Sequence, residues 1–363
     1  MPLSRRKRIV FALLAIALAI GVPFTLALAA DLYLHHRAER FAGVNIWGYR
    51  GPIVGRKRAG EHRLVVLGGS TAFGYGVVWA EAFPAKLEAD LRPLSRGGAP
   101  VSVVNLGMND QGAASFRETL EDYRSLDYDA AVLYEGYNDL AGDEAPNGYN
   151  GRRASPVFRL TGYYPIAPVF LREKAMVIRA GGDLNAAYRG DKTVFRPNLA
   201  SRTSAAALDT AADVGQSLAR QLGRFSREST SSADRAVAAI DPNCTPNWNH
   251  YCAAVRDAIA FALAHGRKVL VVTQPYIDDR HRRQQEALHA MLHATFGGNP
   301  GVATANLGAL IDLFDEKLCY DRMHLTAEGN AIVAQHLVEP IAALMPEAFE
   351  RPATASIRGG GAR

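Results

Sequence analysis

The sequence has few cysteines, and beyond its first residues it has almost no net charge. Its 363 residues include three cysteines, and no C-x-x-C or H-E-x-x-H spacing occurs, so a zinc site has no basis in the sequence. The formal net charge is +5, but Arg5, Arg6, Lys7 and Arg8 supply four of these charges, which leaves 5 − 4 = +1 for the remainder. A body this close to neutral gives little support to a general electrostatic affinity for nucleic acid. The 48% of hydrophobic residues also excludes disorder as the main state.

A long apolar stretch follows the basic residues. Residues 9–30 carry no charge, and as an α-helix rising about 1.5 Å per residue they would cross a bilayer core of about 30 Å. Two interpretations stay open: an uncleaved signal anchor, or a signal peptide with the helix-breaking Pro23 and an A-x-A pattern at Ala27 and Ala29. A buried core helix is a third. Under the first two, the positive-inside rule predicts an extracytoplasmic, periplasmic domain, held by a single-pass helix or secreted after cleavage.

The cysteines suit an exported protein without requiring a disulfide scaffold. Cys244 and Cys252 are eight residues apart, and the spacing leaves open whether they form a disulfide or remain thiols. Cys319 has no partner left, and no histidine base stands beside it in the sequence. We expect its side chain to pack as a small apolar group.

Short apolar runs that end in glycine or polar turns predict buried strands at 62–69, 101–107, 130–136, 267–273 and 302–306. Segments with helical spacing of apolar residues separate them, at 80–91, 114–126, 251–264, 279–296 and 326–345. Alternation of strands and helices implies parallel pairing. The sequence therefore predicts an α/β sandwich of three layers with a mainly parallel sheet of about five strands.

One long segment interrupts the alternation of strands and helices, and it divides the chain into its predicted parts. The stretch 141–241 is too long for a plain loop, so we expect a helical insertion or lid, with an extension of the core as the alternative. The predicted parts are a signal anchor or signal peptide (1–30), a linker and entry segment (31–60), the first half of the sandwich (61–140), the insertion (141–241), the second half (242–346) and a disordered tail (347–363).

Reactive residue types follow the predicted strands. In open parallel sheets ligands bind beyond the carboxyl ends of the strands. Ser70 follows the first strand and Gly107 the second, and Gly136-Tyr137-Asn138-Asp139 follows the third. The segment Asp321-Arg322-Met323-His324-Leu325-Thr326 precedes the last predicted helix.

This set of residues suits acyl transfer. A serine hydroxyl needs a base that takes its proton, which is a role for His324, and a carboxylate such as Asp321 fixes the imidazole tautomer. The N–H groups of Ser70 and Gly107 and the side-chain amide of Asn138 would stabilise the oxyanion. Each residue also has a plainer interpretation: Ser70 as a helix N-cap, His324 as a cap or packed ring, Asn138 as a turn residue and Gly107 as a turn glycine.

The motifs resemble those of the SGNH/GDSL hydrolase family over about residues 61–140 and 265–345. Gly136-x-Asn138-Asp139 and Asp321-x-x-His324-Leu325-Thr326 are similar to the third and fifth blocks of that family. Its first block usually reads G-D-S, and here Gly69 stands in place of the Asp. For the second block, Gly112 is an alternative to Gly107. The resemblance implies a flavodoxin-like sheet, no metal or other cofactor, and hydrolysis of carboxylic esters or acyl transfer to sugars.

We therefore expect an exported, lipase-like serine esterase that works through Ser70, His324 and Asp321 and an acyl-enzyme. Its expected partners are an acyl ester of an envelope glycan or lipid and the cytoplasmic membrane, bound through the N-terminal helix, with no nucleic acid. Tyr75, Tyr137 and Tyr276 lie just beyond strand ends and either line the substrate pocket or pack. Two alternatives remain: an O-acyltransferase acting on envelope glycans, and a catalytically silent envelope scaffold or binding module.

Overall fold

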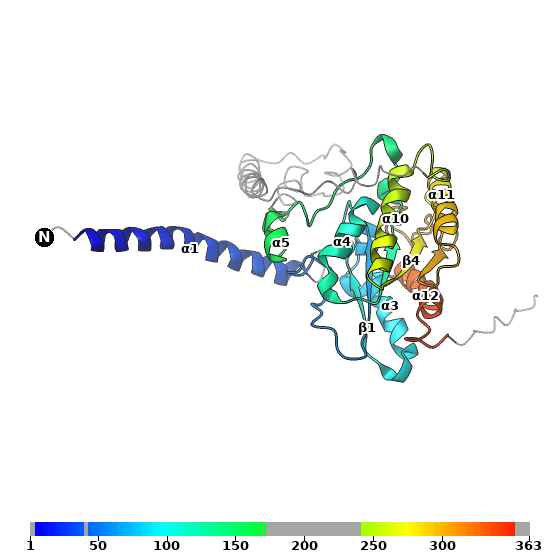
Figure 1. Ribbon diagram of the computed structural model, residues 1–363, viewed down its shortest axis with the longest axis horizontal. Helices are drawn as coiled ribbons and strands as arrows, with labels where there is room; N and C mark the ends of the chain where they lie inside the picture. The colour runs from blue at the N-terminus through cyan, green and yellow to red at the C-terminus, as the bar shows by residue number, and fades with distance from the viewer. Residues whose placement is uncertain (1–3, 40–42, 169, 172–240, 353–363) are drawn as a thin grey trace, which may run out of the picture. The chain divides into compact units, whose positions relative to one another are not determined.

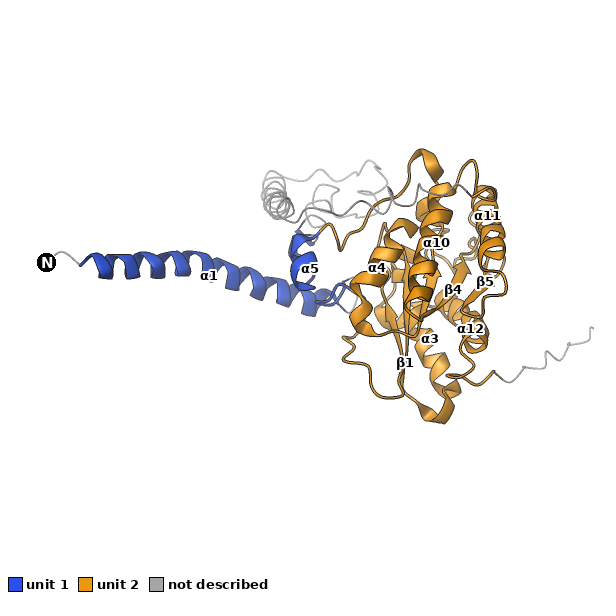
Figure 2. Ribbon diagram, in the orientation of Figure 1, with its two compact units in different colours: residues 1–48, 155–227 blue, residues 49–154, 228–363 orange. Residues whose placement is uncertain are grey.

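The computed structural model describes residues 4–39, 43–168, 170–171 and 241–352. It divides into two compact units, residues 49–154 with 228–363 and residues 1–48 with 155–227 (Figure 2). Most of the predicted insertion, residues 172–240, lies outside the described residues.

A five-stranded sheet forms the centre of the larger unit (Figure 1). All pairings are parallel and the strand order is β2-β1-β3-β4-β5, the flavodoxin-like order, so the predicted fold class is confirmed. The central strands are buried along almost their whole length, because helices cover both faces of a parallel sheet. The strands are β1 (His62–Gly68), β2 (Val101–Asn105), β3 (Ala130–Tyr134), β4 (Lys268–Thr273) and β5 (Val302–Asn306).

Helices pack in pairs against this sheet. On one face α3 (Phe83–Leu91) lies against α12 (Ala327–Leu344), and α4 (Phe116–Asp122) packs against α10 (Asn249–Ala264), which also contacts α11 (Asp279–Phe296). The shorter helices are α2 (Ser70–Phe73), η1 (Trp79–Glu81), η2 (Arg92–Leu94), η3 (Arg96–Gly98), η4 (Ala113–Ser115), η5 (Arg124–Leu126), η6 (Tyr137–Asp139) and η7 (Gly142–Glu144).

The alternation of side chains along the strands builds the main core. Alternate residues of β1, β3 and β4 point to the same face, where they meet the apolar sides of α3 and α12. The residues of this cluster include Leu64, Val66, Val132, Tyr134, Leu270 and Val272 from the strands and Leu87, Leu337 and Ile341 from the helices. Because these contacts fix the strand register, they also fix where each strand ends and its loop begins.

The smaller unit contains the one described helix that is long and apolar enough to cross a membrane. Helix α1 (Arg5–Ala38) has a mean hydropathy of 2.6 in its most apolar window, and none of that window is buried. Pro23 lies inside α1 instead of ending it, and the helix continues over the first eight residues of the predicted linker. At its end, the ring nitrogens of His35 donate to the carbonyl oxygens of Val44 and Tyr164, each at 2.9 Å. Helix α5 (Pro156–Thr161) belongs to the same unit.

Several boundaries differ from the prediction, three of them for identifiable reasons. Helix α3 begins at Phe83 and not at residue 80, because Pro84 favours the first turn of a helix. Residues 141–154 belong to the unit of the sheet, and Arg152 is fully buried there. The predicted disordered tail begins too early: Ala348 and Phe349 have no exposed surface, and Phe349 bridges to Ser95. The buried ring of Phe349 holds this segment against the core, although the residues after it are polar.

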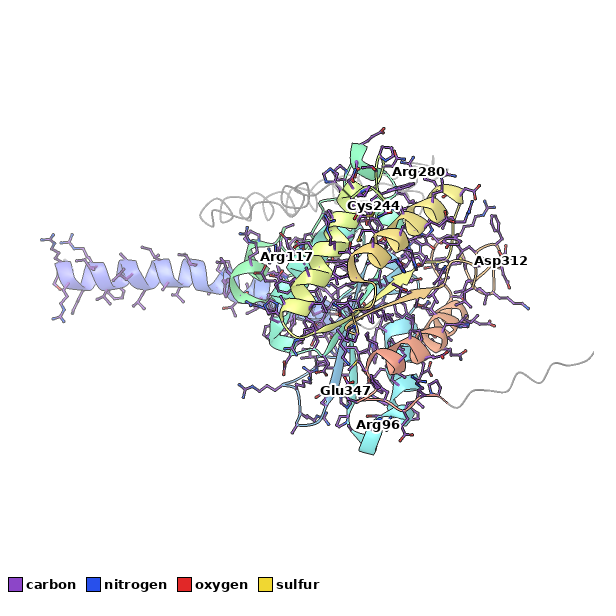
Figure 3. All side chains as sticks on the ribbon, turned by 45° about the vertical axis from the view of Figure 1, so that its right-hand side comes forward. Arg96, Arg117, Cys244, Arg280, Asp312 and Glu347 are labelled. Atoms are coloured by element: carbon purple, nitrogen blue, oxygen red, sulfur yellow. A yellow bond between two sulfur atoms is a disulfide. The ribbon has the colours of Figure 1, made fainter. Side chains whose placement is uncertain are left out.

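The structure decides the pairing of the cysteines. Cys244, beside the start of α10 (Figure 3), forms a disulfide with Cys252 within that helix, with a Cα–Cα distance of 6.4 Å. Cys319 is a buried free thiol.

Candidate active site

The turn between β1 and α2 presents Ser70. A Cβ atom at Gly68 would lie 2.1 Å from the carbonyl oxygen of Tyr134 on β3, so only glycine lets the end of the strand pass so closely. Ser70 is the first residue of α2, and its N–H therefore has no acceptor within that helix. The Arg50 guanidinium caps the other end by donating to the carbonyl oxygens of Phe73 at 2.6 Å and Gly74 at 2.7 Å. Arg50 thus holds the C-terminal end of this short helix.

Ser70, His324 and Asp321 form one hydrogen-bonded chain. Ser70 Oγ lies 2.8 Å from His324 Nε2, and His324 Nδ1 lies 2.6 Å from Asp321 Oδ2. The other carboxylate oxygen accepts the N–H groups of Met323 at 3.0 Å and His324 at 2.7 Å. A carboxylate accepts from Nδ1, so the lone pair of Nε2 faces the serine hydroxyl. The structure therefore brings together three residues that stand up to 254 positions apart.

The carboxyl group of Asp321 is ionised at neutral pH. Burial opposes its charge, but hydrogen bonds from the ring and N–H of His324, the positive charge that this ring can carry, and the N–H of Met323 outweigh burial. The pKa of Asp321 consequently lies below its ordinary value.

Two tyrosines flank the imidazole, and only one of them was predicted. The rings of Tyr75 and His324 have centroids 4.8 Å apart. Tyr320 stacks on the same imidazole at 6.1 Å and donates its hydroxyl to the carbonyl oxygen of Tyr75. The sequence analysis missed Tyr320, although its place directly before Asp321 was a usable signal.

The other two predicted tyrosines lie in packed surroundings. Tyr137 is buried, donates its hydroxyl to the carbonyl oxygen of Pro275 and packs against His281 at 4.7 Å. The ring of Tyr276 fills the space above Gly308, where a Cβ atom would lie 2.1 Å from it. In the part of the chain that the structure describes, both rings pack against His281, whereas Tyr75 and Tyr320 are the tyrosines beside His324.

Two of the three predicted oxyanion donors, Gly107 and Asn138, have partners of their own in this structure. Gly107 N–H donates to Asn105 Oδ1 at 2.9 Å, and a Cβ atom at Gly107 would lie 2.6 Å from the nitrogen of Phe73. Glycine at this position therefore permits the loop after β2 to approach α2. Asn138 Nδ2 donates to the carbonyl oxygen of Gln111 at 2.9 Å and lies 3.4 Å from Glu135 Oε2. A bound oxyanion would have to compete with these acceptors.

The sequence analysis also missed Glu135, the residue after β3. Glu135 is buried, and its Oε1 accepts the N–H groups of Gly136 at 2.9 Å and Asn138 at 3.1 Å. Burial raises the pKa of this carboxyl to about 7 against the lowering effect of its N–H donors. The signal in the sequence was an acidic residue at the end of an apolar run.

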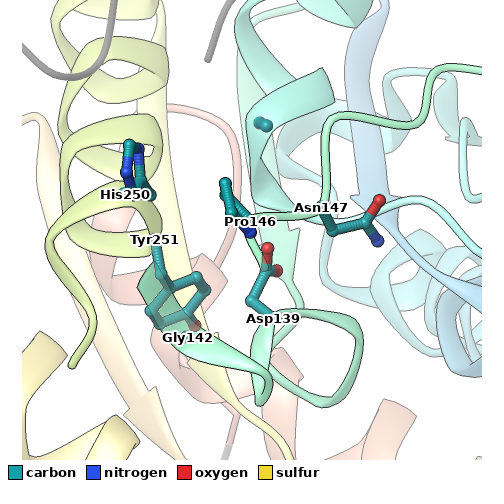
Figure 4. A pocket seen from close by; sticks show the side chains of 7 residues that line it. Asp139, Gly142, Pro146, Asn147, His250 and Tyr251 are labelled. Carbon is teal, nitrogen blue, oxygen red and sulfur yellow. The ribbon is translucent and has the colours of Figure 1, made fainter. Parts of the chain in front are cut away.

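Two pockets lie away from the triad. Figure 4 shows one between Asp139, Pro146 and Asn147 on one side and His250 and Tyr251 of α10 on the other. Its volume of about 10 Å³ suits a single water molecule and not an ester. The second, of about 700 Å³, runs along the outer edge of β2 and includes none of the three residues of the hydrogen-bonded chain.

The described part of the chain holds no group of three His, Cys, Asp or Glu side chains placed to bind a metal ion.

Comparisons with known proteins find similarity in structure alone. No family model and no curated protein matches this chain. A member of the lipolytic protein G-D-S-L family from Veillonella parvula is 10% identical, with a TM-score of 0.39, over 77% of this chain and 97% of that one. An acetylxylan esterase from Geobacillus stearothermophilus is 14% identical, with a TM-score of 0.40, over 77% and 94%. Similarity at this level assigns no activity to the chain.

Proposed function

We propose that this protein is a serine esterase that hydrolyses carboxylic esters through an acyl-enzyme on Ser70. The observation that carries the proposal is the hydrogen-bonded chain from Ser70 Oγ through both ring nitrogens of His324 to Asp321, with links of 2.8 and 2.6 Å. The ionised carboxylate of Asp321 supports it further, because an ionised partner stabilises the imidazolium that forms when His324 takes a proton.

The proposed reaction has two stages. His324 Nε2 takes the hydroxyl proton while Ser70 Oγ attacks the ester carbonyl carbon, and the tetrahedral intermediate collapses when His324 returns the proton to the departing alcohol. Water then attacks the acyl-enzyme, again with His324 as the base, and the acid leaves. The proposed oxyanion donors are the N–H of Ser70, the N–H of Gly107 and the side-chain amide of Asn138, and losing one such donor typically costs about 10²- to 10³-fold in kcat.

The proposed setting is the cell envelope. Within α1 the apolar run follows four basic residues, which supports a single-pass anchor with the catalytic unit on the extracytoplasmic side. An exported esterase at this membrane would meet acylated envelope glycans and lipids. Secretion after cleavage of a signal peptide is the alternative.

The test uses the full chain in detergent with a fluorophosphonate probe and a chromogenic short-chain ester. The wild type is expected to be labelled and to turn over the ester, and Ser70→Ala is expected to lose both. Ser155→Ala, which removes a serine at the start of α5, should behave like the wild type. Equal labelling of wild type and Ser70→Ala would contradict the proposal.

The same assay separates the competing functions. With a sugar acceptor present, an O-acyltransferase would give an acylated sugar in place of the free acid. A catalytically silent scaffold would give neither labelling nor turnover in any variant.

A further inference from the structure

The carboxylate of Glu135 joins two loops of the candidate site. It receives the N–H groups of Gly136 and Asn138 from the loop after β3, and the N–H of Gly69 from the turn that carries Ser70. The side-chain amide of Asn138 also faces it, at 3.4 Å. Within the described ranges no ion pair joins Glu135 to a basic side chain. Its hydrogen-bond donors are therefore amide N–H groups, three of them from the backbone.

Gly69 has no room for a side chain, because Glu135 and Asn138 already fill that space. A Cβ atom at residue 69 would lie 2.1 Å from Asn138 Nδ2 and 2.5 Å from Glu135 Oε2. Backbone conformation does not demand glycine here, since φ is −82°. The limit is steric, and the atoms that impose it are the ends of two polar side chains.

We propose that Glu135 is a positioning residue of the esterase site, and that its carboxylate, reaching across from β3, replaces the acidic side chain that a G-D-S pattern has directly before the nucleophile. This inference rests on the proposed function. A carboxylate can occupy the space beside Ser70 from residue 69 or from residue 135, but not from both. If Glu135 supplies the carboxylate, the glycine at position 69 does not indicate that the site has lost its activity.

The physical role of the carboxylate is to orient amides. The N–H of Gly69 is held toward Glu135, which fixes the turn that leads into the Ser70 N–H. The same carboxylate holds the backbone of Asn138 and limits the rotation of its side chain. Because amide groups of both loops hydrogen-bond to this one side chain, Glu135 fixes the turn of Ser70 relative to the amide of Asn138.

The test compares four variants of the full chain: Glu135→Gln, Glu135→Ala, Gly69→Asp and the double variant Gly69→Asp/Glu135→Ala. For each single variant we expect kcat to fall about 10-fold or more with KM changed less than about threefold, since positioning acts on the transition state. The double variant is expected to recover at least about 10-fold in kcat over Gly69→Asp, because removing Glu135 frees the space for the new carboxylate. If each substitution only damaged the structure, the losses of kcat would add in the double variant and no activity would be recovered.

A matched control distinguishes the loss of any buried carboxylate from the loss of one beside Ser70. Glu61, just before β1 at the opposite end of the sheet, is also buried and accepts from Arg63 and Ser102. Glu61→Gln is expected to lower Tm while kcat stays at the wild-type value. Wild-type kcat in a folded Glu135→Gln, or a double variant no more active than Gly69→Asp, would overturn the inference. If Ser70→Ala kept its turnover, the proposed function would fail instead.

Discussion

At the scale of single residues, Asp321 decides which nitrogen of His324 faces Ser70. An asparagine at 321 keeps an oxygen for the N–H groups of Met323 and His324, but it offers no charge and permits the wrong imidazole tautomer. We therefore expect Asp321→Asn to lower kcat by about 10³- to 10⁴-fold with little change in KM. Steady-state kinetics on a chromogenic ester measures this.

The control for this variant is Asp315→Asn. Asp315 accepts the N–H of Lys317 in a nearby turn and has no contact with His324 among its described hydrogen bonds. Its substitution should leave kcat within about twofold of the wild type. Equal losses in the two variants would mean that Asp321 acts only through the shape of its loop.

A second residue, Asp139, is expected to make the free energy of unfolding depend on pH. Burial, and then the nearby charge of Glu135, raise the pKa of Asp139 well above its ordinary value, although the N–H of Ala113 opposes this. The unfolded chain releases this proton above about pH 4, whereas the folded protein holds it to higher pH. The free energy of unfolding of the wild type therefore falls as pH rises through this window.

Asp139→Asn removes this proton and keeps an oxygen for Ala113. We expect the Tm of the variant relative to the wild type to be higher at pH 8 than at pH 5. Thermal melts followed by circular dichroism at the two pH values measure it. A Tm difference independent of pH would show that Asp139 is not held protonated.

Which site residues the sequence could reveal depends on how local their signal is. Asp321 and His324 stand three residues apart, and Ser70 follows directly on a strand, so short patterns expose them. Glu135 and Arg50 were harder to assign, because a single charged residue is as compatible with solvent as with burial, and the place of Glu135 at the end of an apolar run is a weak signal. The acceptors that hold Gly107 and Asn138 likewise come from packing between loops.

At the scale of elements, the disulfide ties the segment before α10 to the helix itself. Closing a loop of this length stabilises a protein by about 2–3 kcal/mol in the chain-entropy account. We expect Cys244→Ser/Cys252→Ser to lower the free energy of unfolding by about this amount, measured by urea denaturation without reductant. In reductant the wild type should fall to the level of the variant.

Cys319→Ala is the matched control. It removes a buried cysteine but leaves the disulfide, so its stability should still drop when reductant is added. A double serine variant that remained sensitive to reductant would contradict the structural role of the bond.

The elements themselves were largely predictable, and the misses have identifiable causes. The five strands begin within one residue of their predicted positions, because continuous apolar runs bounded by glycine are distinctive. Pro23, which was compatible with a signal peptide, lies inside α1, since a proline can lie inside a long apolar helix. Phe349 was missed, because burial of one ring after a helix leaves no periodic signal.

At the scale of the whole molecule, helix α1 of the smaller unit bears on the proposed location of the protein. Sequence alone left anchor and signal peptide open, since both need a basic start and an apolar run. In the structure, α1 continues without a break from Arg5 to Ala38, past the A-x-A pattern, and Asp31 accepts the N–H of Ala167 at 2.6 Å. The proposed membrane anchor rests on the four basic residues before the apolar run and on the continuation of this helix beyond the A-x-A pattern.

We therefore expect the full-length chain to stay in the membrane pellet after washing with high salt and with alkaline carbonate, and to dissolve in detergent. Mass spectrometry of the pelleted protein should find the basic N-terminal residues still attached. Leu14→Arg/Leu18→Arg places two charges in the apolar run, each costing about 2.5–3.5 kcal/mol at the centre of a bilayer, and should move the protein to the soluble fraction or abolish its accumulation. Ile53→Arg/Leu160→Arg adds the same charges at exposed positions outside the run and should remain in the pellet. A soluble wild-type chain that begins near Ala30 would identify a cleaved signal peptide and contradict the anchor.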